Sequence, residues 1–380
     1  MNFSVLSSIL DQILDAGIPG YDCSVFYRHE PVFRRWGGYS DREALIPMTP
    51  NRLYYIYSAT KVITVTAALQ LLEQGKLNLN DRLDKYFPEF ANMQVSTCFG
   101  PAPAEASITI RDLFCMTGGF GYDLSSPSIL EVKERTNGRC PTQDVIRALA
   151  KEPLLFQPGS RFNYSLCHDV LGAVIEVVSG LSLGQYMKQH IFDPCSMENT
   201  TFHRTPEQDA LFCPEYLYDP NSNSIVRMRK LYNPYALGCE YESGGAGLIS
   251  SVDDYCKFQE ALISGKLIQP ETLALMRQPH LSEQELLGYQ YSFNGLFNYG
   301  LGVSVPTPGR GIPSHFGWGG RAGALTLLDP DRQITMFYAQ HVLDSSKTSA
   351  ELFRGRIKRA VYEGLGIPWG SRIPSPCEGS

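Results

Sequence analysis

The spacing of apolar residues predicts a helix at the start of the chain and a pair of strands directly after it. Apolar residues recur three or four positions apart over the first fourteen residues, at Phe3, Leu6, Ile9, Leu10, Ile13 and Leu14. This spacing is typical of an amphipathic helix. Segments 21–27 and 32–36 are rich in aromatic and β-branched residues and flank the polar turn 28–30, which favours two paired strands. Residues 62–73 are rich in Ala and Leu and are followed by Gly75, so a capped helix is predicted there.

The pattern changes twice more along the chain. Short helical segments separated by Pro/Gly loops are predicted at 110–116, 142–149, 170–179, 183–191 and 252–263. Beyond residue 296, strand-like segments follow at 298–305, 323–328 and 333–340, and a helix is predicted at 350–364. We therefore expect an α+β fold, in which an antiparallel sheet is built from both termini and flanked by helices. The expected domains are a sheet domain of residues 1–94 and 286–380 and a mainly helical insertion of residues 95–285, with the active site at their interface.

Composition and charge narrow the classes of function. Of 380 residues, 43% are hydrophobic and 19% charged, and the net charge of −6 gives no basic face for nucleic acid. No apolar run reaches the roughly 18 residues of a membrane span, and the N-terminus lacks the basic segment of a signal peptide. Ten cysteines are scattered without metal-binding spacing, so they are expected to be reduced thiols in a cytoplasmic protein without metal or cofactor: Cys23, Cys98, Cys115, Cys140, Cys167, Cys195, Cys213, Cys239, Cys256 and Cys377.

The segment 54–61 carries the candidate chemistry. It contains no Gly-x-Ser-x-Gly elbow, and the chain has neither a His-Glu-x-x-His helix nor a Walker loop. Residues 317–322 formally match a loose dinucleotide fingerprint, but they precede a predicted strand instead of a helix. Ser58 and Lys61 form the chain's one Ser-x-x-Lys pair, at the start of the predicted helix 62–73. Residues three apart share a helix face, so the lysine can activate the serine as a nucleophile. Taken alone, however, the pair is better explained by an ordinary helix-capping serine and a solvated lysine.

Several segments, in order, resemble the serine β-lactamase/penicillin-binding protein superfamily, with the class C-like family VIII carboxylesterases most similar. They are 57–61 with 71–81 and 86–90, 109–119 (where Met116 replaces the usual histidine), 156–165 and 243–254. The resemblance spans residues 20–340 and implies the β-lactamase/penicillin-binding fold. It also implies that Tyr164 relays the proton of Ser58, and a neighbouring Lys⁺ is expected to lower the pKa of its phenol.

A third motif of the family allows two registers in this chain. One aligns His315-Phe316-Gly317 with the family's Lys-Thr-Gly; the other aligns Trp318-Gly319-Gly320 with it. The first is preferred. It makes His315 a catalytic residue that tunes the field near Tyr164, makes Gly317 a point of close substrate approach, and pairs the Trp318 amide with that of Ser58 as the oxyanion hole. His168 is interpreted as structural.

Two departures from β-lactamases steer the expected substrate. Leu166 replaces the asparagine that would hold an acylamino group, and His315 and Phe316 replace the Lys and Thr that would hold a carboxylate. Loop aromatics are instead expected to line an apolar substrate pocket: Phe120, Tyr122, Tyr232, Tyr235 and Trp318.

These observations favour a cytoplasmic serine hydrolase that cleaves carboxylic esters through an acyl-Ser58 intermediate. Its expected partner is a small-molecule ester or amide substrate, with no nucleic acid and no membrane, and its oligomeric state is left open. Acyl transfer to an alcohol or amine is a variant that the sequence does not separate from hydrolysis. The alternatives are a β-lactamase or D-amino-acid peptidase/amidase of the same fold and, from another class, a non-catalytic binding or filament-forming protein.

Overall fold

A five-stranded antiparallel sheet joins the two ends of the chain. In the computed structural model, which describes residues 1–229, 233–289, 295–345 and 351–370, the strand order is β12-β13-β1-β2-β3. The strands are β1 (Gly20–Tyr27), β2 (Glu30–Asp41), β3 (Ile46–Pro47), β12 (Leu325–Asp329) and β13 (Ile334–Gln340). Central strand β1 pairs with β2 on one side and with β13 on the other, where Ser24 faces Phe337. This arrangement confirms the α+β prediction and the sheet built from both termini.

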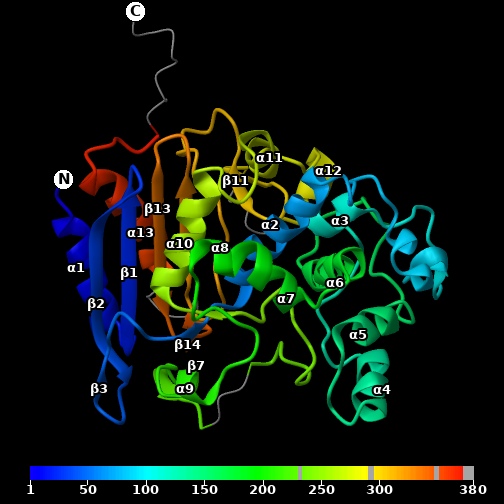
Figure 1. The fold of residues 1–380 in the computed structure, drawn as a ribbon, viewed down its shortest axis with the longest axis horizontal. Helices are drawn as coiled ribbons and strands as arrows, with labels where there is room; N and C mark the ends of the chain where they lie inside the picture. Colours follow the sequence, from blue (N-terminus) through cyan, green and yellow to red (C-terminus); the bar gives the residue numbers. More distant parts are fainter. Residues whose placement is uncertain (230–232, 290–294, 346–350, 371–380) are drawn as a thin grey trace, which may run out of the picture.

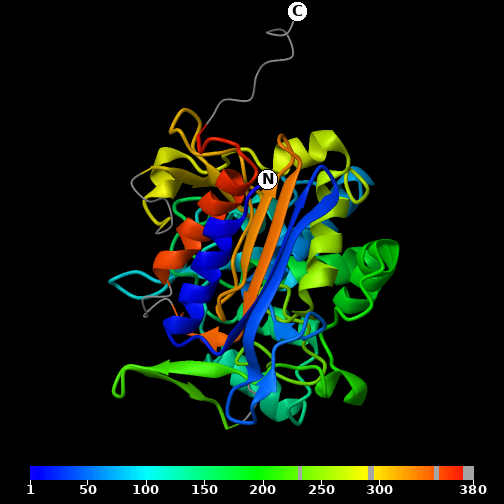
Figure 2. The same ribbon diagram turned by 90° about the vertical axis from the view of Figure 1, so that its left-hand side faces the viewer.

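Helices cover both faces of this sheet. On one face, α1 (Ser4–Asp15) and α13 (Glu351–Gly364) lie side by side, and on the other lies α10 (Val252–Ile263) (Figures 1 and 2). The predicted apolar stripe of α1 is buried at Leu6, Ile9, Leu10 and Ile13, which pack in one core with residues of β1, β12 and β13. The first residue predicted for the last helix, Ala350, lies outside the described residues.

A second and larger core surrounds helix α2 (Thr60–Glu73) in the helical half of the molecule. Nearly every residue of α2 up to Leu71 is buried, as expected for a helix that is apolar on all sides. Helix α6 (Cys167–Ser179) packs along it (Figure 1). The other helices are α3 (Ile110–Cys115), α4 (Pro127–Arg135), α5 (Thr142–Leu149), α7 (Leu183–Met187), α8 (Asp193–Cys195), α9 (Pro206–Asp209), α11 (Pro270–Met276) and α12 (Glu283–Leu286).

Several short strands lie outside the main sheet, and they differ most from the sequence prediction. The segment expected as one strand at 298–305 is a hairpin of β10 (Phe297–Tyr299) and β11 (Ser304–Pro306), because the chain turns at Gly302 with φ +80°. Inside the segment predicted to be mainly helical, β7 (Tyr216–Asp219) and β8 (Ser224–Arg227) form a hairpin, and β7 pairs with β14 (Val342–Leu343). The remaining short pairs are β4 (Tyr54–Tyr55) with β9 (Ile249–Ser250), and β5 (Gln94–Val95) with β6 (Ala102–Pro103). The domain boundaries at 94/95 and 285/286 stay a prediction.

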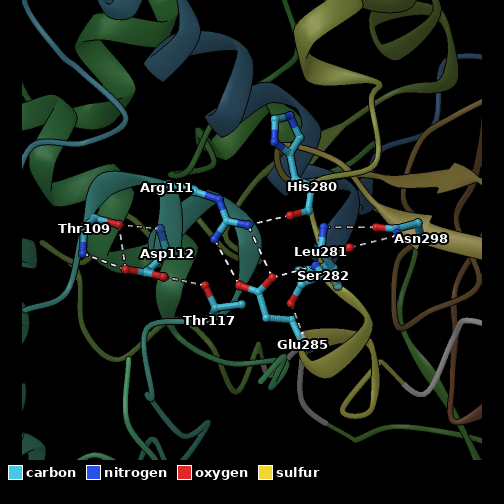
Figure 3. A network of polar contacts seen from close by, with 9 residues as sticks. All are labelled: Thr109, Arg111, Asp112, Thr117, His280, Leu281, Ser282, Glu285 and Asn298. Carbon is cyan, nitrogen blue, oxygen red and sulfur yellow. Dashed lines mark hydrogen bonds and ion pairs between the residues drawn. The ribbon is translucent and has the colours of Figure 1, made fainter. Parts of the chain in front are cut away.

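Helix α3 is held by a polar network that reaches across to α12 (Figure 3). The side chain of Thr109 accepts a hydrogen bond from the Asp112 amide, and the Asp112 carboxylate accepts in return from the Thr109 amide, which forms a capping box. Arg111 Nη1 lies 3.1 Å from Oε1 of the buried Glu285, and Nη2 donates to the His280 carbonyl oxygen. The network fixes α3 and α12 relative to each other and to the segment leading into β10.

Across the described ranges, no single helix combines the length and apolar character that a membrane crossing requires. One pair, Cys167–Ser179 and Leu183–Cys195, satisfies those criteria only jointly and is bent by 75°. The cysteines of the described ranges form no disulfide; Cys377 lies outside them.

Candidate active site

Ser58 lies in a short turn that is held on both sides. Strand β4 leads into a 3-10 turn, Tyr57–Ala59, which runs directly into α2. Tyr57 has φ +46°, a left-handed conformation that is unfavourable for a bulky residue. Its side chain is fully buried and donates a hydrogen bond to Glu215, and its ring packs edge-on against Tyr235. These contacts hold the strained turn and leave Ser58 half-buried.

Lys61 lies one helical turn after Ser58 and is fully buried. Its Nζ is 3.3 Å from Ser58 Oγ and donates to the Gly245 carbonyl oxygen at 2.7 Å. Burial lowers the pKa of Lys61 to about 8, and the nearby Asp169 carboxylate opposes that effect. A substantial fraction of neutral amine is therefore present at mildly alkaline pH.

The phenol of Tyr164 completes the group around Ser58. It comes from the loop before α6, and its OH lies 2.6 Å from Ser58 Oγ. Lys61 Nζ is 4.6 Å from the centre of its ring, and the ring stacks on Tyr122 and on Trp318 at 5.7 and 5.6 Å between centroids. Burial raises the pKa of Tyr164 and outweighs the lowering by its hydrogen bonds with Ser58 and Trp318. The expectation that Lys61 lowers the pKa of this phenol is thus corrected: the tyrosine is protonated at neutral pH.

The third motif takes the register that the sequence analysis did not prefer. Trp318 Nε1 donates a hydrogen bond to the Tyr164 OH at 3.2 Å. His315 is buried instead between Tyr362 and Trp369, with burial holding its pKa well below the usual value. It therefore does not tune the field at Tyr164.

The role predicted for the Trp318 amide is corrected as well. The Trp318 amide donates to Thr326 Oγ1 at 2.8 Å, so it is already bonded to a side chain of β12. Gly317 has φ +142°, and a Cβ there would lie 2.2 Å from the same Thr326 oxygen. This close packing requires a glycine, and the approach of a substrate to Gly317 stays a prediction.

The predicted aromatic residues divide between site and core. Tyr122 stacks on Tyr164, and Tyr235 meets Tyr122 edge-on at 5.5 Å. Phe120 is buried in the core against Phe90, so it is corrected from pocket to packing residue. Tyr232 lies outside the described residues.

Two further residues near the amine have no signal in the sequence pattern. Asp169 is buried in the first turn of α6, and the carbonyl of Gly245 accepts from Lys61. Neither belongs to a spacing that predicts chemistry, although Gly245 falls in the segment 243–254 that resembles the family. His168, expected to be structural, is fully buried, and its Nε2 lies 3.2 Å from the Phe114 carbonyl oxygen. Within the described parts of the chain, no cluster of His, Cys, Asp and Glu side chains could hold a metal ion.

Comparison with known proteins decides the family. A family model described as Beta-lactamase matches residues 6–358. The chain belongs to the beta-lactamase family. It is 30% identical to esterase EstB of Burkholderia gladioli, over 85% of this chain and 86% of EstB, and 26% identical to a putative D-alanyl-D-alanine carboxypeptidase of Escherichia coli K12, over 93% and 86%.

A solved structure of similar fold supports the assignment to the beta-lactamase family. EstCE1, described as a hydrolase with promiscuous acyltransferase activity, superposes with a TM-score of 0.77 at 28% identity, covering 94% of this chain and 97% of EstCE1. Together with the family match, these similarities identify the chain as a serine hydrolase.

Proposed function

We propose that this serine hydrolase cleaves carboxylic esters through an acyl-Ser58 intermediate. The observation that carries the proposal is the position of Ser58 Oγ, 2.6 Å from the Tyr164 phenol and 3.3 Å from the buried Lys61 amine. The similarity to EstB and EstCE1 supports an ester as substrate.

The hydrogen bonds around Ser58 support Lys61 as the general base. Tyr164 accepts a hydrogen bond from Trp318 Nε1 and donates its own proton to Ser58 Oγ, so the serine proton is left to point at the neutral amine of Lys61. Lys61 takes that proton as Ser58 Oγ bonds to the ester carbonyl carbon. When the ester C–O bond breaks, the leaving alkoxide takes the proton of Tyr164, which regains one from the Lys61 ammonium. Water then attacks the acyl group by the reverse sequence, and an alcohol in place of water gives acyl transfer.

We propose the amides of Ser58 and Arg321 as the oxyanion hole. Gly320 packs against the segment before the nucleophile so closely that a Cβ there would lie 2.3 Å from the Ile56 carbonyl oxygen. The next amide along the chain is that of Arg321, whereas the amides of Trp318 and Gly320 are bonded to Thr326 and Ala324. Each such donor contributes roughly 10²–10³-fold to the rate of acyl transfer.

The substrate is expected to lack a carboxylate anchor. With Trp318 in the register of the family's Lys, Gly319 takes the place of Thr, and Leu166 is buried at the start of α6 where an amide would be needed. The aromatic faces of Tyr122 and Trp318 favour an apolar group beside the reacting carbon. The cytoplasmic location stays a prediction.

Intact-protein mass spectrometry tests the nucleophile. Wild type is treated with a fluorophosphonate probe and, separately, assayed with p-nitrophenyl butyrate, beside Ser58→Ala and the control Ser8→Ala on the exposed face of α1. We expect one adduct and ester turnover in wild type and in the control, and neither in Ser58→Ala. Absence of both in folded wild type would overturn the proposal and favour a binding protein. Nitrocefin turnover comparable with ester cleavage would instead favour a β-lactamase.

A further inference from the structure

A carboxyl group lies buried beside the buried amine of Lys61. Asp169 is 1% exposed, and it belongs to α6, which packs along α2. The chemistry proposed above makes no use of it. A buried carboxyl group is costly unless it is hydrogen-bonded or paired with a positive charge, so its position asks for an explanation.

The peptide of Gly245 connects the two groups. The Gly245 carbonyl oxygen accepts a hydrogen bond from Lys61 Nζ at 2.7 Å, and the N–H of the same peptide, on Ala246, donates to Ser243 Oγ, whose hydroxyl is bonded to Asp169. Gly245 and Asp169 approach each other so closely that a Cβ at residue 245 would lie 2.4 Å from Asp169 Oδ2. Glycine is therefore needed for the contact, and the polarised peptide links the carboxylate to the ammonium.

Two hydroxyl groups hold the Asp169 carboxylate in place. Ser243 Oγ donates to Oδ1 at 2.5 Å and Tyr241 OH donates to the same oxygen at 3.1 Å. Burial raises the pKa of Asp169 above its usual value, although the charge of Lys61 and these two hydrogen bonds oppose the effect. Donors gathered on one buried carboxyl group favour its ionised form.

Burial favours the neutral form of five other groups near Lys61. Burial raises the pKa of Tyr122, Tyr164 and Tyr241, and it raises that of Cys167 to about 12. Burial lowers the pKa of His168 to about 3, with the charge of Lys61 adding to the effect. Tyr235 also faces the amine, through its electrostatic interaction with it.

We infer that Asp169 is a positioning residue for Lys61: through the Gly245 peptide it fixes the place of the amine and sets the pH at which the amine gives up its proton. The inference rests on the proposed function, in which neutral Lys61 is the base. Without the carboxylate, the Lys61 ammonium loses its counter-charge. The lowering of the Lys61 pKa by burial is then no longer opposed by Asp169.

The pH dependence of fluorophosphonate labelling of Ser58 tests this inference. Wild type, Asp169→Asn and the control Tyr241→Phe, which removes a hydrogen bond to the same carboxylate but keeps its charge, are compared between pH 6 and 10. We expect the midpoint of the rise in labelling rate to move down by about one pH unit in Asp169→Asn and to stay near wild type in Tyr241→Phe. A labelling rate that falls equally at all pH values, with an unmoved midpoint, would make Asp169 a purely structural residue and overturn the inference.

A second measurement separates failure of the inference from failure of the proposed function. NMR of protein labelled with ¹⁵N-lysine, with the Lys61 signal assigned through Lys61→Arg, reports the titration of the amine whether or not Ser58 reacts. It also serves if Asp169→Asn does not fold, because fully buried lysines without a counter-charge titrate near pH 5–6. A wild-type midpoint near 8 supports the carboxylate's role, and a midpoint below about 6 contradicts it. If wild type does not react with the fluorophosphonate and Lys61 still titrates near pH 8, the result would count against the proposed function alone.

Discussion

Burial acts in opposite directions on the two groups that contact Ser58 Oγ. It removes charge from both, because it lowers the pKa of the Lys61 amine and raises that of the Tyr164 phenol. Above the pKa of Lys61 both groups are neutral, and the amine has a lone pair for the serine proton. The pKa values of Lys61 and Tyr164 therefore set the pH window of the reaction.

Ester turnover is expected to rise with pH through about 8. Lys61 has a pKa of about 8, so the active neutral form is a minority at pH 7 and dominates by pH 9. The measurement is kcat/KM for p-nitrophenyl butyrate between pH 6 and 9.5, with Ser58→Ala correcting for spontaneous hydrolysis. A rate that declines over this window would mean that the ammonium is the active form.

Trp318→Phe and His315→Ala are expected to act on different properties. The phenylalanine keeps a ring against Tyr164 but loses the N–H donor, so kcat should fall about ten-fold. His315→Ala leaves a cavity beside Tyr362 and Trp369; it should lower the free energy of unfolding by about 2 kcal/mol and leave kcat within about two-fold. The measurements are kcat and the free energy of unfolding in urea for both variants. A larger loss of kcat from His315→Ala would favour His315-Phe316-Gly317 as the third motif.

These residues show where sequence reasoning succeeds and where it stops. Ser58 and Lys61 are brought together by helical spacing alone, and Tyr164 by its motif. His315 and Trp318 are separated by an odd number of positions, so along an extended segment their side chains face opposite sides. The choice between them depends on strand register, which the sequence did not determine. Asp169 is brought to Lys61 by the packing of α6 on α2 and not by any local pattern.

At the scale of elements, local signals located helices better than short strands. Helices 142–149 and 252–263 were predicted at their observed bounds, and Ser251 caps the second of them. The start of α6 was placed three residues late, because Cys167, His168 and Asp169 give no helical periodicity. The β7–β8 hairpin was missed, since its pairing with β14 brings together residues more than 100 positions apart.

The ion pair between α3 and α12 is expected to contribute strongly to stability. Arg111→Met leaves the buried Glu285 carboxylate without its partner and should lower the free energy of unfolding by about 3 kcal/mol at pH 7. Although burial raises the pKa of Glu285, the hydrogen bonds from Arg111 and Ser282 leave it lowered. Its stabilisation is therefore present above the unfolded pKa of about 4.3 and is lost as the pH falls through the lower folded value.

Urea unfolding at pH 7 and at pH 4 measures this contribution. The difference between wild type and Arg111→Met should shrink at the lower pH, and the double variant Arg111→Met/Glu285→Gln should recover part of the loss. An equal loss at both pH values would show that the arginine acts through packing alone.

At the scale of the whole molecule, the two ends of the described chain meet. The Asn2 amide donates to the Gly364 carbonyl oxygen at 2.8 Å, and α1 lies against α13 (Figure 2). A circular permutant with residue 370 joined to Met1 by a short flexible linker, and new ends between Cys98 and Phe99 in an exposed turn, should therefore fold. Circular dichroism and fluorophosphonate labelling at wild-type levels are expected, and an insoluble or unlabelled permutant would contradict the prediction.

The same closure of the sheet has a consequence for biosynthesis. Strand β1 leaves the ribosome well before its partner β13, which follows roughly 300 residues later, and this interval takes about 15 to 60 s at usual elongation rates. Throughout that time one edge of β1 lacks its native neighbour and is open to other strands. The segment that carries Trp318 is also synthesised late. A nascent chain therefore contains Ser58 long before its active site is complete.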